Sequence, residues 1–428
     1  MLSLTERKAI KQLMEQEIIP SIGCTEPIAV SLCVAKATEL LEHRPEKIDV
    51  LLSSNVTKNA MGVGIPGTKM IGLPIAIALG ALIGKSEYEL EVLRDFNADH
   101  LKVAKQYINE DRINIAVKDN PPHNLYIEVV CYAQNSYVRT IISGTHTFFS
   151  LIEKDGTVLH SKEFEEVNTS DVSVGLNLRK VYDYASEAPI EELSFIYAAA
   201  KMNKKVSDEA KNDNYGHNVS KILAGKRGVT AFGNNPHSKM LIATSAACDV
   251  RMGGAKLAVM SNSGSGNQGI AATLPVLSYA EEIGADKETL IRALILSSLS
   301  VIYIKQSLGR LSALCGCVVA STGSSCGITY LMGGTYNQVA FATKNMIANI
   351  TGMICDGAKP SCSLKISSSV STALLSAVMA MENAVVSEQE GIVDKDVDQT
   401  ILNMSVVGKE GMLETDKVVL DIMTNREY

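Results

Sequence analysis

The segment YVRTIISGTHTFFSLIEKDG (137–156) decides the fold class, because its residues alternate between apolar and polar in the manner of half-buried β-strands. Similar patterns flank it in RINIAVKD (112–119), NLYIEVVCYA (124–133) and TVLHSKEF (157–164), and a charged helical pattern, YELEVLRDFNADHLKVAKQYI (88–108), precedes them. The region 88–185 is therefore predicted to form a small α+β unit with antiparallel hairpins.

Both ends of the chain have a helical period instead. Residues 3–19 and 26–42 predict two helices, and IDVLLSSNV (48–56) predicts a strand after them. Beyond about residue 190 nearly every segment is helical, with Gly- and Ser-rich turns between the helices. We expect an α+β fold. Its mainly helical catalytic domain comprises residues 1–87 plus 186–428, and its inserted antiparallel α+β domain comprises residues 88–185.

The composition argues against nucleic acid and membrane as partners. The net charge is −7 with no basic stripe, and 46% of the 428 residues are apolar, which is enough for a sizeable core. The first residues are charged and amphipathic, so we expect no signal peptide. The most apolar stretch, 70–84, is short for a membrane span. We expect a cytoplasmic protein that acts on a small molecule, with a homo-oligomer possible.

The nine cysteines have no signal peptide before them, which argues against a disulfide framework. Cys33, Cys131 and Cys248 lie within apolar runs and are interpreted as packing residues. The other six lie next to Gly, Pro or Thr, where helices begin and end: Cys24, Cys315, Cys317, Cys326, Cys355 and Cys362.

Cys24 precedes a helix with a readable start. Thr25 can cap that helix, and Pro27 suits its first turn because no N–H donor is needed there. Cys24 then lies at the positive end of the helix dipole, which predicts a lowered pKa and a reactive thiolate. The alternative is a loop cysteine without a role.

The loop CDGAKPSC (355–362) places two thiols between two helices. A third thiol can come from LSALCGC, which offers Cys315 and Cys317 about forty residues upstream. Three thiolates with no nearby histidine suit an iron–sulfur cluster. Structural zinc usually takes four closed ligands in CxxC pairs. From the residues alone, a cluster, a zinc ion and no metal all stay open.

A second candidate site is MSNSGSGNQGIAATLP (260–275), in which glycines and small polar residues lead into a helix. Its backbone N–H groups can hold a carboxylate or phosphate. The substrate-binding candidates are Ser263, Gly264, Ser265, Gly266 and Asn267. An ordinary Gly/Ser linker is the alternative. No βαβ pattern surrounds the G-x-G-x-x-G spacing, which argues against a dinucleotide.

Three further polar residues complete the set of candidates. His146, in ISGTHTFF, follows a strand pattern and a glycine and is a candidate substrate-binding residue, although a lone histidine is more often structural. Arg310 and Lys365 lie close in sequence to the cluster cysteines. Either can pair with a substrate carboxylate, although most such charges are simply solvated.

Four motifs together resemble the L-cysteine desulfidase family: SIGCTEPIAV, NSGSGNQGIAATLPV, LSALCGC and GMICDGAKPSCSLK. The resemblance covers nearly the whole chain. The helical C-terminal half is also similar, more weakly, to iron–sulfur L-serine dehydratases. The implied cofactor is a [4Fe–4S] cluster held by Cys315, Cys355 and Cys362, with one iron open to substrate. Cys24 matches the family's catalytic cysteine, the proposed proton acceptor.

The activity implied by this resemblance is β-elimination of H₂S from L-cysteine, which yields pyruvate and ammonia. The first alternative is a serine-dehydratase-like hydro-lyase with the same cluster. A pyridoxal-phosphate lyase would need a lysine for a Schiff base, and no lysine is marked for that role. From a different class, a non-catalytic iron–sulfur sensor is also considered, but such proteins usually carry a DNA-binding or partner domain.

Overall fold

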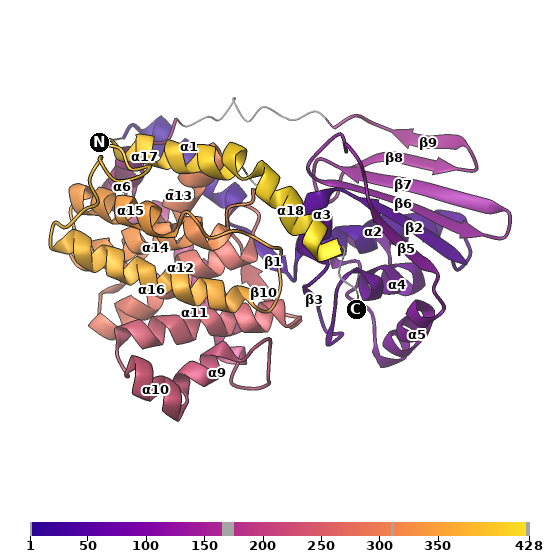
Figure 1. Ribbon diagram of the computed structural model, residues 1–428, viewed down its shortest axis with the longest axis horizontal. Helices are drawn as coiled ribbons and strands as arrows, with labels where there is room; N and C mark the ends of the chain where they lie inside the picture. The colour runs from indigo at the N-terminus through magenta and orange to yellow at the C-terminus, as the bar shows by residue number, and fades with distance from the viewer. Residues whose placement is uncertain (1, 165–174, 310–311, 425–428) are drawn as a thin grey trace.

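The computed structural model describes residues 2–164, 175–309 and 312–424, and it has a helical half and a half built on a β-sheet (Figure 1). The chain starts in the helical half with α1 (Leu4–Glu17) and β1 (Pro20–Ile22). It crosses to the sheet half at α2 (Thr25–Leu41) and returns after β9 (Thr157–Ser161). The predicted α+β fold class is confirmed.

The sheet has six strands in the order β5-β2-β6-β7-β8-β9. The strands before β9 are β2 (Lys47–Leu52), β5 (Ile113–Val117), β6 (Tyr126–Ala133), β7 (Ser136–Ser143) and β8 (Phe149–Lys154). β2 and β5 are parallel, and every other pair is antiparallel. Strands β5 to β9 therefore lie where the alternating patterns predict them.

Helices cover one face of this sheet and form its core. These helices are α2, α4 (Leu73–Ile83) and α5 (Ala98–Asn109), joined by α3 (Ser54–Ala60), β3 (Gly64–Ile65), β4 (Met70–Ile71) and the 3₁₀ helix η1 (Ser86–Glu91). Cys33 of α2 and Cys131 of β6 are fully buried in this core. The thiol of Cys33 lies 3.2 Å from the hydroxyl of Thr140, so both cysteines pack as the sequence indicates.

The sheet half begins earlier in the chain than predicted. We expected an inserted unit of 88–185, but β2 lies inside the sheet between β5 and β6, and α2 and α4 share the core of the sheet. The parallel pairing of β2 with β5 joins strands some sixty residues apart in the sequence, and a local pattern carries no sign of it. The division into two folding domains stays a prediction.

The helical half packs around α14 (Gly316–Leu331), whose small side chains are almost all buried. Its other elements are α6 (Leu178–Glu187), α7 (Ile190–Leu193), α8 (Ile196–Glu209), α9 (Val219–Ala224), α10 (Lys226–Phe232), α11 (Pro236–Met252), β10 (Ala258–Met260), α12 (Gly266–Ile283), α13 (Lys287–Leu308), α15 (Tyr336–Ile350), α16 (Cys362–Met381), α17 (Val397–Val406), the π-helix η3 (Val407–Gly411) and α18 (Leu413–Thr424). Figure 1 shows α18 reaching from the helical half towards α3.

One helix among the described residues, α16, is long and apolar enough to cross a membrane by length and composition. Its buried face packs in the helical core through small residues such as Ser369, Ala373 and Ala377. Core helices of soluble proteins commonly have this composition, so α16 is weak evidence for a membrane span.

Candidate functional site

Two of the predicted cluster cysteines lie side by side because a short β-bridge joins their segments. Leu314 pairs with Ile354 in an antiparallel bridge. The Cys315 N–H donates to the Met353 carbonyl at 3.0 Å, and the Cys355 N–H donates to the Ala313 carbonyl at 2.7 Å. The Cys315 thiol also exchanges hydrogen bonds with the thiols of Cys317 and Cys355. The contact with Cys317, together with burial, raises the pKa of Cys315 well above its ordinary value, and the contact with Cys355 opposes this. The bridge therefore gathers three thiols at the start of α14.

The third predicted cysteine, Cys362, begins α16, and its thiol lies 3.6 Å from the Gly357 carbonyl oxygen. The turn before it depends on Gly357, which has φ 89° and lies against α3. A Cβ atom at this position would lie 2.0 Å from the Lys58 carbonyl oxygen. The 355–362 loop thus packs against the backbone of Lys58. The buried ammonium of Lys58 forms an ion pair with Asp416 of α18. The hydrogen bond with Cys315 and burial raise the pKa of Cys355 well above its ordinary value, and the positive charge of Lys58 opposes this.

A further thiol, Cys248 of α11, belongs to the same region. Burial is the main cause of its raised pKa, and the charges of Cys362 and Cys315 add to it. The interpretation of Cys248 as a packing residue is therefore incomplete, because its helix carries it to the other thiols. A usable signal was present in the sequence, since Cys248 is followed by the charged residues Asp249 and Arg251 directly after the uncharged run 240–247. Cys326, by contrast, contacts the hydroxyl of Thr343 at 3.3 Å in the core.

The side chains gathered here are of the type that holds an iron–sulfur cluster. Five neighbouring cysteines, Cys248, Cys315, Cys317, Cys355 and Cys362, are all free thiols. Thiolates are the ligands that iron–sulfur clusters take, so these residues can supply three of them. Within residues 2–164, 175–309 and 312–424, no three His, Cys, Asp or Glu side chains are already arranged around one metal position.

Cys24 lies at the N-cap position of α2, and its side chain forms no capping hydrogen bond. Its Sγ lies 2.9 Å from Oε2 of Glu26 and 3.8 Å from the Asn59 carbonyl oxygen. The predicted lowering of its pKa is wrong. Burial raises the pKa of the Cys24 thiol well above its ordinary value, and the Glu26 carboxylate adds to this, while the charge of Arg251 opposes it. The helix dipole does not offset the loss of water and an adjacent negative charge.

Glu26 is a functional candidate that the sequence analysis missed. Its Oε1 accepts a hydrogen bond from Asn59 Nδ2 at 3.2 Å. Burial acts to raise the pKa of this carboxyl. The charge of His146, the Cys24 hydrogen bond and the charge of Arg251 act in the opposite direction. Their combined effect outweighs that of burial, so the net pKa of Glu26 lies below its ordinary value. His146 is thus brought close to Glu26. The adjacent letters C-T-E were a visible signal, because a carboxylate two residues from a thiol can face it.

Arg251 joins Cys24 to the Gly/Ser loop. It is buried near the end of α11, where its Nη2 donates to the Gly23 carbonyl at 2.8 Å and its Nη1 donates to Asn267 Oδ1 at 3.0 Å. Gly266 lies against the guanidinium, since a Cβ atom there would be 2.4 Å from Nε. Arg251 was also missed by the sequence analysis. The contacts of Arg251 bring the segment before α2 and the first turn of α12 into one site.

The loop 261–269 is held by its own hydrogen bonds and by the end of α1. The Ser263 N–H donates to the Glu17 carbonyl at 3.0 Å, and Ser265 caps α12 by accepting from the Gln268 N–H. Gly264 is exposed, with open space where a side chain would be. The N–H groups of Gly266 and Asn267 lie in the first turn, where an α-helix supplies no carbonyl partner.

The loop also borders the thiols. A Cβ atom at Gly316, between Cys315 and Cys317, would lie 3.1 Å from the Gln268 side chain. The two basic residues that the sequence analysis considered as carboxylate partners, Lys365 and Arg310, do not supply an unpaired cation beside the thiols in the described residues. Lys365 pairs with Asp356 and donates to the Ile354 carbonyl, and Arg310 lies outside the described residues.

The profile of the serine dehydratase alpha chain family matches residues 87–421. The chain belongs to the serine dehydratase alpha chain family. UPF0597 proteins are similar over almost the full length of both chains. The one from Bacteroides thetaiotaomicron is 60% identical over 423 residues, which cover 99% of each chain. That from Porphyromonas gingivalis is 51% identical over 428 residues, and that from Clostridium perfringens is 40% identical over 425 residues, each covering 98% of this chain and 99% of the relative.

The predicted relation to iron–sulfur serine dehydratase alpha chains is thereby confirmed. Membership of the serine dehydratase alpha chain family implies an enzyme of the hydro-lyase type and suggests an iron–sulfur cofactor. The names of the UPF0597 relatives do not state an enzymatic activity.

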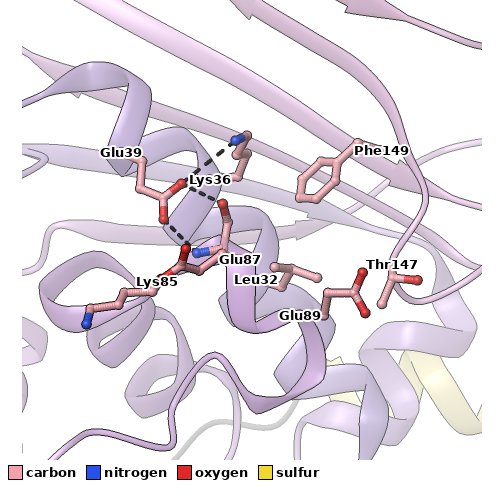
Figure 2. Close-up of a pocket in the computed structure, with 9 residues that line it drawn as sticks. Leu32, Lys36, Glu39, Lys85, Glu87, Glu89, Thr147 and Phe149 are labelled. Atoms are coloured by element: carbon pink, nitrogen blue, oxygen red, sulfur yellow. Dashed lines mark hydrogen bonds and ion pairs between the residues drawn. The ribbon is translucent and has the colours of Figure 1, made fainter.

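A separate cavity of about 590 Å³ lies on the sheet half, where α2, η1 and the β7–β8 turn meet (Figure 2). Its lining is mainly charged and includes Lys36, Glu39, Glu87 and Glu89. Glu39 already accepts hydrogen bonds from the Ser86 backbone and hydroxyl. None of the thiols described above lines this cavity, so it is distinct from the site around Cys24.

Proposed function

We propose that this serine dehydratase alpha chain family member is an L-cysteine desulfidase, which eliminates H₂S from L-cysteine and yields pyruvate and ammonia. The observation that carries the proposal is the contact of Cys24 Sγ with Glu26 Oε2 at 2.9 Å, next to Arg251 and the Gly/Ser loop. A thiol and an ionised carboxylate in contact form a pair that can move a proton.

The proposed cofactor is a [4Fe–4S] cluster, for which Cys315, Cys355 and Cys362 are the ligands. When bound, the cluster supplies a Lewis acid that draws electrons from the substrate sulfur. The position of Cys315 across the β-bridge from Cys355 supports its choice as a ligand. Cys317 and Cys248 are the neighbouring thiols that can take its place.

Proton transfer in this proposal begins within the Cys24–Glu26 pair. Because Cys24 is a protonated thiol when buried beside a carboxylate, it first gives its proton to Glu26. The resulting Cys24 thiolate takes the proton from the substrate Cα. The Cα–H electron pair forms the Cα=Cβ double bond, and the Cβ–S bond breaks with its electrons on hydrosulfide. Hydrosulfide then takes the proton held by Glu26 and leaves as H₂S, which returns the Cys24–Glu26 pair to its starting state. Aminoacrylate tautomerises to an imine, and water hydrolyses the imine to pyruvate and ammonium, so no net oxidation occurs.

The remaining proposed residues orient the substrate. We assign substrate binding to Ser263, Gly264, Ser265, Gly266, Asn267 and His146. Support for the loop comes from the N–H groups in the first turn of α12, which suit an anion. Support for His146 comes from its charge, which acts on Glu26 and keeps that carboxylate ionised.

Dehydration of L-serine is the second candidate, and the match to the serine dehydratase alpha chain family favours it. The two activities differ in the leaving group. Hydroxide is a far poorer leaving group than hydrosulfide, so a dehydratase needs an acid close to the substrate oxygen. The lowered pKa of Glu26 keeps that carboxyl ionised, apart from the proton that Cys24 gives it during the reaction. Hydrosulfide can leave before it takes that proton, whereas hydroxide cannot, which supports cysteine as the substrate.

The test compares both substrates on anaerobically purified protein. We expect sulfide, pyruvate and ammonia in equal amounts from L-cysteine, with a kcat/KM well above that for L-serine. Pyruvate from L-serine with no sulfide from L-cysteine would establish the dehydratase instead. Full activity in colourless, iron-free protein would reject the cluster part of the proposal.

A further inference from the structure

We propose that Arg251 binds the α-carboxylate of the substrate and makes the enzyme specific for free α-amino acids. This inference deepens the proposed function and rests on it. Nothing in the sequence marks Arg251 for the role, because it lies in the helical pattern of α11, apart from the four motifs.

Arg251 is a buried cation without an acidic partner. Its side chain is only 6% exposed, and its two hydrogen bonds go to the neutral acceptors Gly23 O and Asn267 Oδ1. Its Nε is buried and unpaired. Within the described parts of the chain no carboxylate lies within 4.0 Å of the guanidinium; the charge of Arg251 reaches Glu26 only as an influence on its pKa. A buried charge of this kind is costly unless an anion joins it.

The other cations near the thiols already have partners. Lys58 pairs with Asp416, and Lys359 and Lys365 both pair with Asp356. These three lysines are therefore already neutralised. Arg251, the fourth cation, is the one whose positive charge is available to a bound anion. Its position suits a substrate, because it contacts the residue before Cys24 and the first turn of α12 at the same time.

The chemistry of the guanidinium sets the class of ligand. Arginine has five N–H donors in a planar fork, and the two hydrogen bonds described leave three. A planar carboxylate can accept two parallel N–H bonds from such a fork. Gly266 and Asn267, in the first turn of α12, both contact the guanidinium, and the positive end of that helix favours a negative charge. An ester or an amine lacks that charge.

The test measures equilibrium binding by calorimetry on anaerobic holoenzyme, with L-alanine and L-alanine methyl ester as ligands. Alanine has no leaving group on Cβ, so the proposed reaction does not consume it during the measurement. The variants are Arg251→Gln, which removes the charge, and Arg251→Lys, which keeps the charge but loses the fork. Arg292→Gln is the matched control, because Arg292 is also largely buried and donates to backbone carbonyls, those of Ala185 and Ala188.

Wild-type protein should bind the acid about 100-fold more tightly than the ester, as expected for a charged bidentate contact. Arg251→Gln should lose that preference, Arg251→Lys should keep part of it, and Arg292→Gln should keep all of it. An unchanged preference in folded Arg251→Gln, or an equal affinity of the wild type for acid and ester, would overturn the role of Arg251. Arg251-dependent binding of L-alanine in a protein that releases no sulfide from L-cysteine would instead refute the proposed function alone.

Discussion

The Cys24 thiol and the Glu26 carboxylate lie 2.9 Å apart at the start of α2, where Cys24 is buried and Glu26 is half-buried. This contact reverses the expectation from helix position alone. The dipole at a helix start favours a thiolate, whereas burial and the neighbouring carboxylate favour the neutral thiol. Cys24 can therefore act as a base only together with Glu26.

Replacing Glu26 by glutamine should separate the ionisation of Cys24 from its catalytic use. The variant removes the negative charge and replaces one carboxylate oxygen by an NH₂ donor. Both the charge and the carboxylate hydrogen bond raise the pKa of Cys24, so the thiol should ionise at lower pH. Turnover should nevertheless fall about 10²-fold, because the proton acceptor for Cys24 is lost. Alkylation of Cys24 by iodoacetamide, followed across pH by peptide mass spectrometry, measures the first effect.

The matched control for this experiment is Glu39→Gln, which changes an exposed carboxylate on the same helix. It should leave the alkylation profile of Cys24 unchanged. A Glu26→Gln profile identical to that of the wild type would show that the contact does not govern the thiol.

Cys24 and Cys355 should differ in their effect on iron. Cys24→Ser should keep its iron and acid-labile sulfide and lose turnover by about 10²–10⁴-fold, since it removes a base and not a ligand. Cys355→Ser should lose the iron itself. Iron content and the optical spectrum of anaerobic protein measure both. Cys326→Ala is the control, because Cys326 is buried in the core of the helical half, where its thiol contacts the Thr343 hydroxyl. Loss of iron in Cys24→Ser would make Cys24 a fourth ligand.

Gly357→Ala should disturb the loop that carries Cys355 and Cys362. The residue has φ 89°, and an added Cβ atom would collide with the Lys58 carbonyl oxygen at 2.0 Å. We expect a loss of more than about 1 kcal/mol in the free energy of unfolding and less than half of the wild-type iron content. Gly352→Ala is the control, since open space surrounds that position. Wild-type iron and stability in Gly357→Ala would mean that the loop can shift freely.

Asp416→Asn should weaken the attachment of α18 to the rest of the molecule. Lys58 is almost fully buried, and Asp416 is its ion-pair partner, so the substitution leaves a buried ammonium without a counter-charge. We expect the free energy of unfolding, from urea denaturation, to fall by about 1.5–3 kcal/mol. Asp421→Asn changes an exposed carboxylate on the same helix and should have almost no effect. Equal stability of the two variants would rule out a structural role for the ion pair.

Several features of this protein follow from local sequence pattern. The strands from β5 to β9 lie where the alternation of apolar and polar residues predicts them, because a strand exposes successive side chains to opposite faces. The start of α2 beside Cys24 and the placement of Cys355 and Cys362 on either side of one loop were equally readable, since prolines and glycines act over a few residues. The predicted cap is wrong, because Cys24 and not Thr25 occupies the N-cap position, and the Cys24 side chain forms no capping hydrogen bond.

Other features depend on contacts between residues far apart in the chain. β2 joins the sheet through β5 and β6, Cys248 reaches the thiols of Cys315 and Cys362, and Arg251 bonds to Gly23 across more than two hundred residues. The pKa of Cys24 belongs to this group as well. Its direction is set by burial and neighbouring charges, which exist only once distant segments have packed together, whereas periodicity and helix caps are properties of a single segment.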